Sequence, residues 1–314
     1  MQDFIKYANK ADFAPAYAIL SRAAPYTERE LLRRIFFYGW CRPVISVATA
    51  ARLGLLSIVR YQHEVLQYTS LGPAFMVAIV NGHVSVVEYL DSRVPHFPSA
   101  ITIAARSNQW DVVRYFIGRG GYDLTTVLIK ASQYGRFDIV QRALQGPVNV
   151  HSMDNCALRM AAEHGHLSIV SLLLEHGADV HGGNEYALIH ASRSGHLKVV
   201  QVLIQHGANV TARDSYAMRM AARQGHYLVV QLLIRHGSDV HAHTDQAFRD
   251  AVDYNYIDLV KFLVETCDVD PWIHNGYGAR WSAIYGHRAL VDYFEAYRPN
   301  LFKYLSAPKT QPTL

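Results

Sequence analysis

The feature that most constrains this chain of 314 residues is an internal repeat with a period of 30 residues. Three consecutive segments align without gaps: ALRMAAEHGHLSIVSLLLEHGADV from Ala157, ALIHASRSGHLKVVQVLIQHGANV from Ala187 and AMRMAARQGHYLVVQLLIRHGSDV from Ala217. A fixed period of this length is typical of proteins built from stacked structural units, whose core extends along one axis. Such a chain does not need one large globular core.

The same register extends outward over nine units. One position in every unit is glycine or asparagine, the residues that most readily adopt the left-handed conformation that ends a helix: Gly54, Gly82, Asn108, Gly135, Gly165, Gly195, Gly225, Asn255 and Gly286. Five residues later each unit has a valine: Val59, Val87, Val113, Val140, Val170, Val200, Val230, Val260 and Val291. Four residues before the turn each unit has a small residue, alanine in eight units and Ser282 in the last. The pattern predicts nine tight turns, each between two closely packed helices.

The apolar residues after each turn follow a helical period, as in Leu167, Val170, Leu173 and Leu174, so one face of a second helix is expected to be buried. Each unit is therefore predicted to be a helix, a turn and an antiparallel helix. One such hairpin cannot bury its apolar face alone, so the units must stack. The predicted fold is an all-α helical repeat solenoid with about nine helix-turn-helix units.

The run G-H-L-x-x-V-x-x-L-L-x-x-G-A-D-V resembles the ankyrin repeat, in matching register over about residues 42–305 and most specifically over residues 155–270. The ankyrin opening T-P-L-H is absent, and Cys156–Arg159 stand in its place in one unit. The central period of 30 residues is also shorter than the ankyrin period of about 33. The resemblance implies an ankyrin-type solenoid with shortened inter-repeat hairpins. Its style is similar to the ankyrin families of giant DNA viruses and amoebae.

The predicted array covers residues 42–298, between two terminal segments. Residues 1–41 are interpreted as N-terminal capping helices and residues 299–314 as a C-terminal cap and flexible tail, because the end units of a solenoid must shield its core. Within the first segment, Glu30–Phe36 loosely resembles the opening of an F-box. This resemblance leaves open an alternative function, that of a substrate adaptor for a ubiquitin ligase.

No motif for catalysis or cofactor binding is visible in the sequence. The phosphate-binding loop, the G-x-S-x-G elbow, H-E-x-x-H and C-x-x-C are absent, so we expect no enzyme activity and no cofactor. Many of the 17 histidines have a place in the repeat, and five that follow the turn glycine are expected to hydrogen-bond to adjacent backbone: His83, His166, His196, His226 and His287. Repeats are spaced by about 10 Å, far beyond the ~2 Å reach of a metal ligand, so no metal site is predicted.

The ankyrin resemblance implies a concave groove formed by the first helices and the loop tips. The two residues before each turn position face this groove in the ankyrin pattern, and here they vary while the scaffold repeats, although free drift of exposed positions would also produce variation. Arginine and tyrosine, common anchors of protein interfaces, recur there. The predicted anchors are Arg106, Tyr134, His164, Arg193, Arg223, Tyr254 and Tyr285, and the predicted rim consists of Met153, Asn155, Gly183, Glu185, Arg213, Ser215, His243 and Asp245.

The expected function is therefore non-catalytic binding of a protein partner, with a viral host-interaction role as one form of it. A net charge of +4 is modest, and Glu163 and Asp253 interrupt the arginines, which argues against nucleic acid as the partner. No apolar run approaches a signal peptide or the ~18 residues of a membrane span. The three cysteines, far apart and odd in number, indicate a reducing compartment. We expect a monomeric, soluble intracellular protein.

Overall fold

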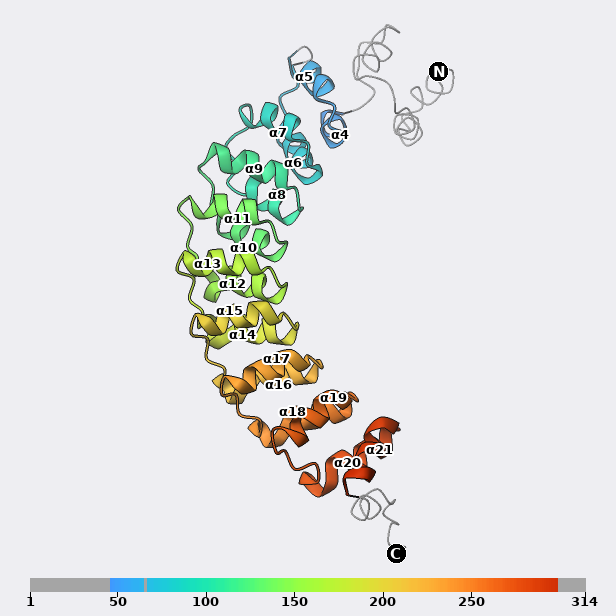
Figure 1. Ribbon diagram of the computed structural model, residues 1–314. Coiled ribbons are helices and arrows are strands. Elements are labelled where there is room, and N and C mark those ends of the chain that lie inside the picture. The colour runs from blue at the N-terminus through green and yellow to red at the C-terminus, as the bar shows by residue number, and fades with distance from the viewer. Residues whose placement is uncertain (1–45, 65–66, 299–314) are drawn as a thin grey trace, which may run out of the picture. The chain divides into compact units, whose positions relative to one another are not determined.

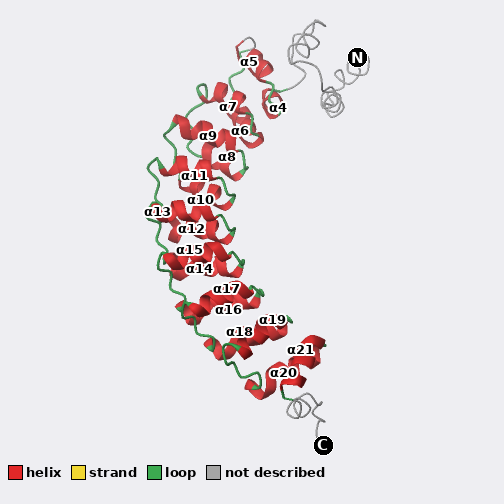
Figure 2. Cartoon of the chain, in the orientation of Figure 1, coloured by secondary structure: helices red, strands yellow, loops and turns green. Residues whose placement is uncertain are grey.

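The computed structural model describes residues 46–64 and 67–298. Within these ranges the chain forms 18 helices and no strand, arranged as nine helical pairs (Figures 1 and 2). The predicted all-α fold of paired helices is confirmed for this part of the chain, and loops without strands agree with shortened hairpins. The predicted capping helices of residues 1–41, the F-box-like segment Glu30–Phe36 and the predicted tail of residues 299–314 lie outside the described residues.

The chain divides into two compact units between Val127 and Leu128, within α10 (Thr125–Gln133). The first unit contains three complete helical pairs: α4 (Val47–Arg52) and α5 (Leu56–Glu64), α6 (Gly72–Asn81) and α7 (Val84–Asp91), and α8 (Ala100–Arg106) and α9 (Trp110–Arg119). The second unit contains α11 (Phe137–Leu144), α12 (Ser152–Glu163), α13 (Leu167–Glu175), α14 (Gly182–Arg193), α15 (Leu197–Gln205), α16 (Ala212–Arg223), α17 (Tyr227–Arg235), α18 (Ala242–Asp253), α19 (Ile257–Glu265), α20 (Ile273–Tyr285) and α21 (Arg288–Tyr297).

Within each unit, first helices pack on first helices and second helices on second helices. In the first unit α4 contacts α6 and α5 contacts α7, and in the second unit α12, α14, α16, α18 and α20 contact one another in sequence. The small residue four positions before the turn is fully buried in every repeat, from Ala50 to Ser282. A larger side chain there would force the neighbouring first helices apart.

The repeated valines lie in the core between the helices. Eight of them, from Val59 to Val260, are completely buried. Val291 in α21, at the same repeat position, is only half-buried. It belongs to the last repeat of the described residues, where no described repeat follows to cover it.

The nine turn positions all have a left-handed backbone, with φ between 60° and 79°. Gly54 and Gly286, the first and last of them, have φ values of 72° and 70°, and the two asparagines, Asn108 and Asn255, have values of 61° and 60°. Most other residue types would be strained in this conformation. The sequence-based prediction of tight left-handed turns is therefore confirmed at every position.

Four first helices of the second unit open in a way that the sequence did not predict. Each opening has three consecutive residues with positive φ: Met153–Asn155, Gly183–Glu185, Arg213–Ser215 and His243–Asp245. Such a conformation costs about 1–2 kcal/mol for each non-glycine residue, so it needs compensating contacts. Arg219, at the place of the histidine in T-P-L-H, donates to the carbonyl oxygens of Asp214 and Arg213 at 3.0 and 3.1 Å. An arginine thus stabilises the opening in place of the missing motif.

Candidate functional site

Within each of the two units, the residues that precede the turns form a row of variable side chains, one pair at the end of each first helix. We call this set the turn row: the two residues immediately before each of the nine turn positions. Every member is at least partly exposed. Arg106 is an exposed predicted anchor in the first unit, and the exposed anchors of the second unit lie at or just beyond the ends of successive first helices: Tyr134, His164, Arg193, Arg223, Tyr254 and Tyr285. Because these side chains are exposed, a binding partner could reach them.

The backbone of the turn row is held by the repeat that follows it. Four histidines place Nε2 within hydrogen-bond distance of the carbonyl oxygen of the first residue in a turn-row pair: His83 to Arg52 (2.8 Å), His166 to Gln133 (3.0 Å), His196 to Glu163 (2.9 Å) and His226 to Arg193 (3.0 Å). Gln109 donates to the Val80 carbonyl at 3.0 Å in the same way. His287 bonds through Nδ1 to the Val252 carbonyl at 3.0 Å. The predicted backbone bonds of all five turn histidines are therefore confirmed.

Charges of both signs occur along the turn row of the second unit, where Arg193 and Arg223 lie between Glu163 and Asp253. Arg193 Nη2 lies 2.6 Å from Glu163 Oε1 on the preceding repeat, and His190 Nδ1 lies 3.2 Å from the other carboxylate oxygen. Burial lowers the pKa of His190 despite this carboxylate. Arg223 lies on the repeat after Arg193, and a hydrogen bond with Tyr254 of the following repeat raises the pKa of Arg223. These charges do not form the continuous basic stripe that nucleic-acid binding requires.

Large apolar side chains are exposed at the last two repeats of the turn row, on α20 and just beyond the end of α18, and these two helices contact each other. The exposed fractions are 49% for Tyr254, 62% for Ile284 and 57% for Tyr285. Trp281 stacks on Tyr285 with 5.3 Å between ring centroids. We call these four residues the aromatic end. Contiguous exposed apolar side chains are typical of interaction sites.

Two members of the aromatic end, Trp281 and Ile284, were not among the anchors chosen from the sequence. They lie four residues and one residue before Tyr285 on the same helix, and the spacing of four places Trp281 beside Tyr285. Helical spacing around an anchor would have found Trp281, and Ile284 precedes the predicted anchor Tyr285 directly. Neighbouring Asp253 accepts a hydrogen bond from the Tyr277 hydroxyl at 2.7 Å, and burial raises the pKa of that hydroxyl. Asp253 is therefore engaged within the protein.

The predicted rim residues separate into an exposed group and a buried group. Met153 is 73% exposed, and Arg213 and His243 are also exposed. Gly183 is half-buried, and the other four members are buried, with exposed fractions of 6% for Asn155, 3% for Glu185, 1% for Ser215 and 3% for Asp245. The prediction that these four residues form an exposed rim was wrong.

The buried rim residues are the third residues of the left-handed openings, where each side chain serves the loop. Asn155 Oδ1 accepts from the backbone N–H of Asp179 at 2.9 Å, and Ser215 Oγ accepts from that of Asp239 at 2.8 Å. In the other two repeats a histidine four residues earlier pairs with the buried carboxylate: His181 with Glu185 and His241 with Asp245, each at 2.6 Å. A hydrogen bond with Glu185 raises the pKa of His181. These residues stabilise inter-repeat loops.

Side chains that could support metal or thiol chemistry do not converge in the described part of the chain. No group of three or more histidine, cysteine, aspartate or glutamate side chains is placed there to hold a metal ion. Cys156 is buried, and burial raises the pKa of the half-buried Cys267 thiol, which keeps it protonated. Between residues 46 and 298, gaps aside, no helix has the length and apolar character needed to span a membrane.

Comparison with protein families matches the turns and helices described above to known repeats. A model of three ankyrin repeats matches residues 101–182 and 128–214, and a model of a single ankyrin repeat matches residues 217–245. A search of curated proteins finds no significant match. The matched residues include the repeats that form most of the turn row in the second unit. The chain therefore contains ankyrin repeats, which in other proteins are typically modules of protein–protein interaction and generally non-catalytic.

Proposed function

We propose that the chain binds a protein partner, without catalysis, through the turn row and aromatic end of the second unit. The observation that carries this proposal is that residues such as Glu163 and Arg193 combine a fixed backbone with a variable side chain. Their carbonyl oxygens are fixed by a histidine of the next repeat, while their side chains differ from repeat to repeat. A fixed backbone lowers the entropy cost of ordering a binding surface.

The side chains of this surface suit a protein rather than a small metabolite. Tyr254, Ile284 and Tyr285 offer wide apolar contact area, which supports a hot spot at the aromatic end. Arg193 and Arg223 add guanidinium groups that already interact with Glu163 and Tyr254 within the chain. A hydrogen bond from either arginine to a partner would therefore replace part of an existing interaction. The proposed partner therefore presents an apolar segment flanked by polar groups.

Two narrower roles have less support. A ubiquitin-ligase adaptor would depend on Glu30–Phe36, which lie outside the described residues, so we do not propose that role. A virus–host setting rests on the style of the repeat sequence alone and adds no residue to the proposed surface.

Site-specific photo-crosslinking tests the proposal. The photoreactive residue p-benzoylphenylalanine replaces Tyr254 in one protein and Gln201, exposed on the second helix α15, in the control. In lysate from cells where the protein occurs, we expect a discrete crosslinked protein with the Tyr254 variant only. Adding the substitutions Arg223→Ala and Tyr285→Ala should reduce its yield. Identical crosslinks from both positions, or an unchanged yield, would contradict the proposed surface.

A further inference from the structure

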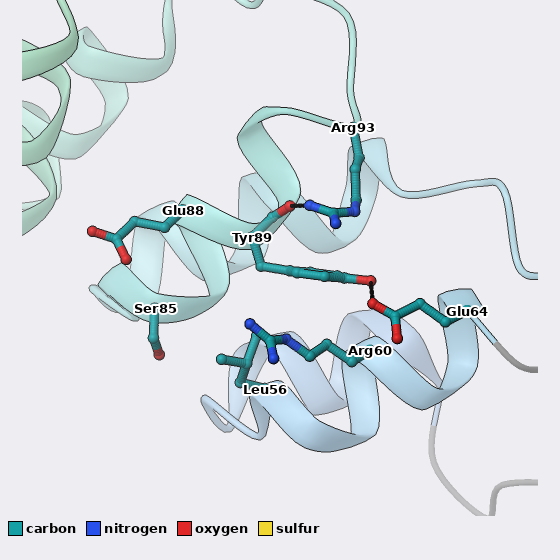
Figure 3. A pocket seen from close by; sticks show the side chains of 7 residues that line it. All are labelled: Leu56, Arg60, Glu64, Ser85, Glu88, Tyr89 and Arg93. Carbon is teal, nitrogen blue, oxygen red and sulfur yellow. Dashed lines mark hydrogen bonds between the residues drawn. The ribbon is translucent and has the colours of Figure 1, made fainter.

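A hollow of about 440 Å³ lies between the second helices α5 and α7 of the first unit (Figure 3). It is separate from the turn row, which lies on the first helices. Both helices contribute one face to its lining: Leu56, Arg60 and Glu64 from α5, and Ser85, Glu88, Tyr89 from α7 with Arg93 just beyond its end. The volume suits two or three side chains of a bound segment.

Tyr89 lines this hollow between α5 and α7 and is only 6% exposed. Its hydroxyl donates to Glu64 Oε1 at 2.9 Å and lies 2.8 Å from His63 Nδ1. The guanidinium groups of Arg93 and Arg60 lie on opposite sides of the ring, 3.9 and 5.1 Å from its centroid (Figure 3). Because the ring lies between the two guanidinium groups, they cannot both bind the same anion.

The lining charges differ in how far the chain itself satisfies them. Arg93 donates to the Tyr89 carbonyl at 2.7 Å, and Glu64 accepts from the Tyr89 hydroxyl. Among the described residues, by contrast, neither Arg60 nor Glu88 forms a hydrogen bond or ion pair, and the Arg60 guanidinium lies over the face of the Tyr89 ring. A cation–π contact leaves the N–H groups at the guanidinium edge available. One cation and one carboxylate thus face the same hollow with bonding capacity left.

This combination narrows the chemistry of an occupant. A purely anionic ligand would meet Glu64 and Glu88, a purely cationic ligand would meet Arg60 and Arg93, and an apolar ligand would leave these charges desolvated. We propose that the hollow is a second docking site, which takes a protein segment carrying an acidic and a basic side chain a few residues apart. The acidic side chain pairs with Arg60 and the basic one with Glu88. The Ser85 hydroxyl, at the same edge, bonds the backbone of the segment.

Titration of the full chain with blocked tripeptides tests whether the hollow prefers a segment with one acidic and one basic side chain. The probes are N-acetylated, C-amidated Glu-Ala-Lys, Glu-Ala-Glu and Lys-Ala-Lys, and the readout is the titration of the backbone amide signals of Leu56 and Ser85 by NMR. We expect saturable shifts with Glu-Ala-Lys and weaker ones with the other two. Arg60→Gln and Glu88→Gln should each weaken binding about two- to fivefold, the range for exposed ion pairs. Arg235→Gln, exposed on α17, is the matched control.

Charge reversal distinguishes pairing from general loss of the surface. Arg60→Glu should make Lys-Ala-Lys the preferred probe, and Glu88→Arg should make Glu-Ala-Glu the preferred probe, with far-UV circular dichroism unchanged in both variants. Equal titration by all three probes would overturn the proposal. So would free glutamate or lysine that reproduces the shifts as strongly as Glu-Ala-Lys, because the occupant would then be a small molecule and not a protein segment.

Discussion

Replacing Gly195 by alanine tests how strongly each turn is coupled to the following repeat. Gly195 has φ of 77°, and a Cβ atom there would lie 2.5 Å from His226 Nδ1 and 2.6 Å from Cε1. The left-handed backbone costs an alanine about 1–2 kcal/mol. Moving the ring away breaks the 3.0 Å bond from His226 to the Arg193 carbonyl, which contributes about 1 kcal/mol. We expect the free energy of unfolding to fall by about 2–3 kcal/mol.

The assay is urea unfolding followed by circular dichroism on a double-mutant cycle of Gly195→Ala and His226→Ala. With the ring removed, Gly195→Ala should cost only its backbone strain, about 1–2 kcal/mol, so the two changes are non-additive. Because a repeat array can unfold in segments, amide hydrogen exchange in α15 and α17 is measured as well.

Gly286→Ala is the matched control for this cycle. Gly286 is also a turn glycine, with φ of 70°, but an added Cβ atom has no neighbour within 4 Å among the described residues. It should therefore cost only the backbone strain. Equal losses for Gly195→Ala and Gly286→Ala, together with additive energies in the cycle, would refute the claim that the next repeat enforces glycine.

Three further substitutions probe other parts of the scaffold. Arg219→Ala removes a 6% exposed guanidinium that donates to two backbone carbonyls, so unfolding in urea should show a loss of about 2–3 kcal/mol. Leu203→Ala in the fully buried face of α15 should cost about 3 kcal/mol in the same assay, against less than about 0.5 for the exposed Gln205→Ala. Glu185 raises the pKa of His181 above 6.5, so their pair stabilises the folded state fully below that pH and less as pH rises through the raised value. His181→Ala should therefore destabilise more at about pH 5.5 than at about pH 8.5, compared by urea midpoints.

The sequence was sufficient to predict the repeat, its turns and most of its core. Gly165 and Asn255 occupy positions where the backbone has a positive φ. Because few residue types tolerate a positive φ, the recurrence of glycine and asparagine reveals these turns in the sequence alone. Val170 and Ala161 carry a packing requirement that recurs with the same spacing, and both are completely buried. These requirements are local, so one residue type at one position is enough to reveal them.

The left-handed openings could not be predicted, because they depend on side-chain contacts outside the opening, some of them from the next repeat. Arg213, Asp214 and Ser215 are ordinary residues for which three successive positive φ angles are unfavourable. The contacts that compensate come from Arg219 later in the same helix and from the loop that reaches Ser215 from the next repeat. Placing Ser215 and its equivalents on an exposed rim followed from an ankyrin loop pattern that this chain does not share.

The candidate surface was partly predictable for a related reason. Exposure of Arg193 and Tyr254 follows from their place just before a turn. The small residue of each repeat, two positions before Arg193 and three before Tyr254, faces the neighbouring first helix, and the helical rotation points these two side chains away from that helix. The pairing of Arg193 with Glu163 depends on side-chain conformations across two repeats, and sequence spacing alone does not fix them. Single positions were therefore predictable, whereas their partners were not.

The link between scaffold and surface lies in residues that serve both. Glu163 gives its carbonyl to His196 of the next repeat and its carboxylate to Arg193 on the exposed row. The backbone bond requires no particular side chain at Glu163, because every residue has a carbonyl. Stacking therefore constrains the histidine and the turn glycine and leaves the turn-row side chain free to vary. The turn-row side chains can therefore differ from repeat to repeat while the hydrogen bonds between successive repeats are kept.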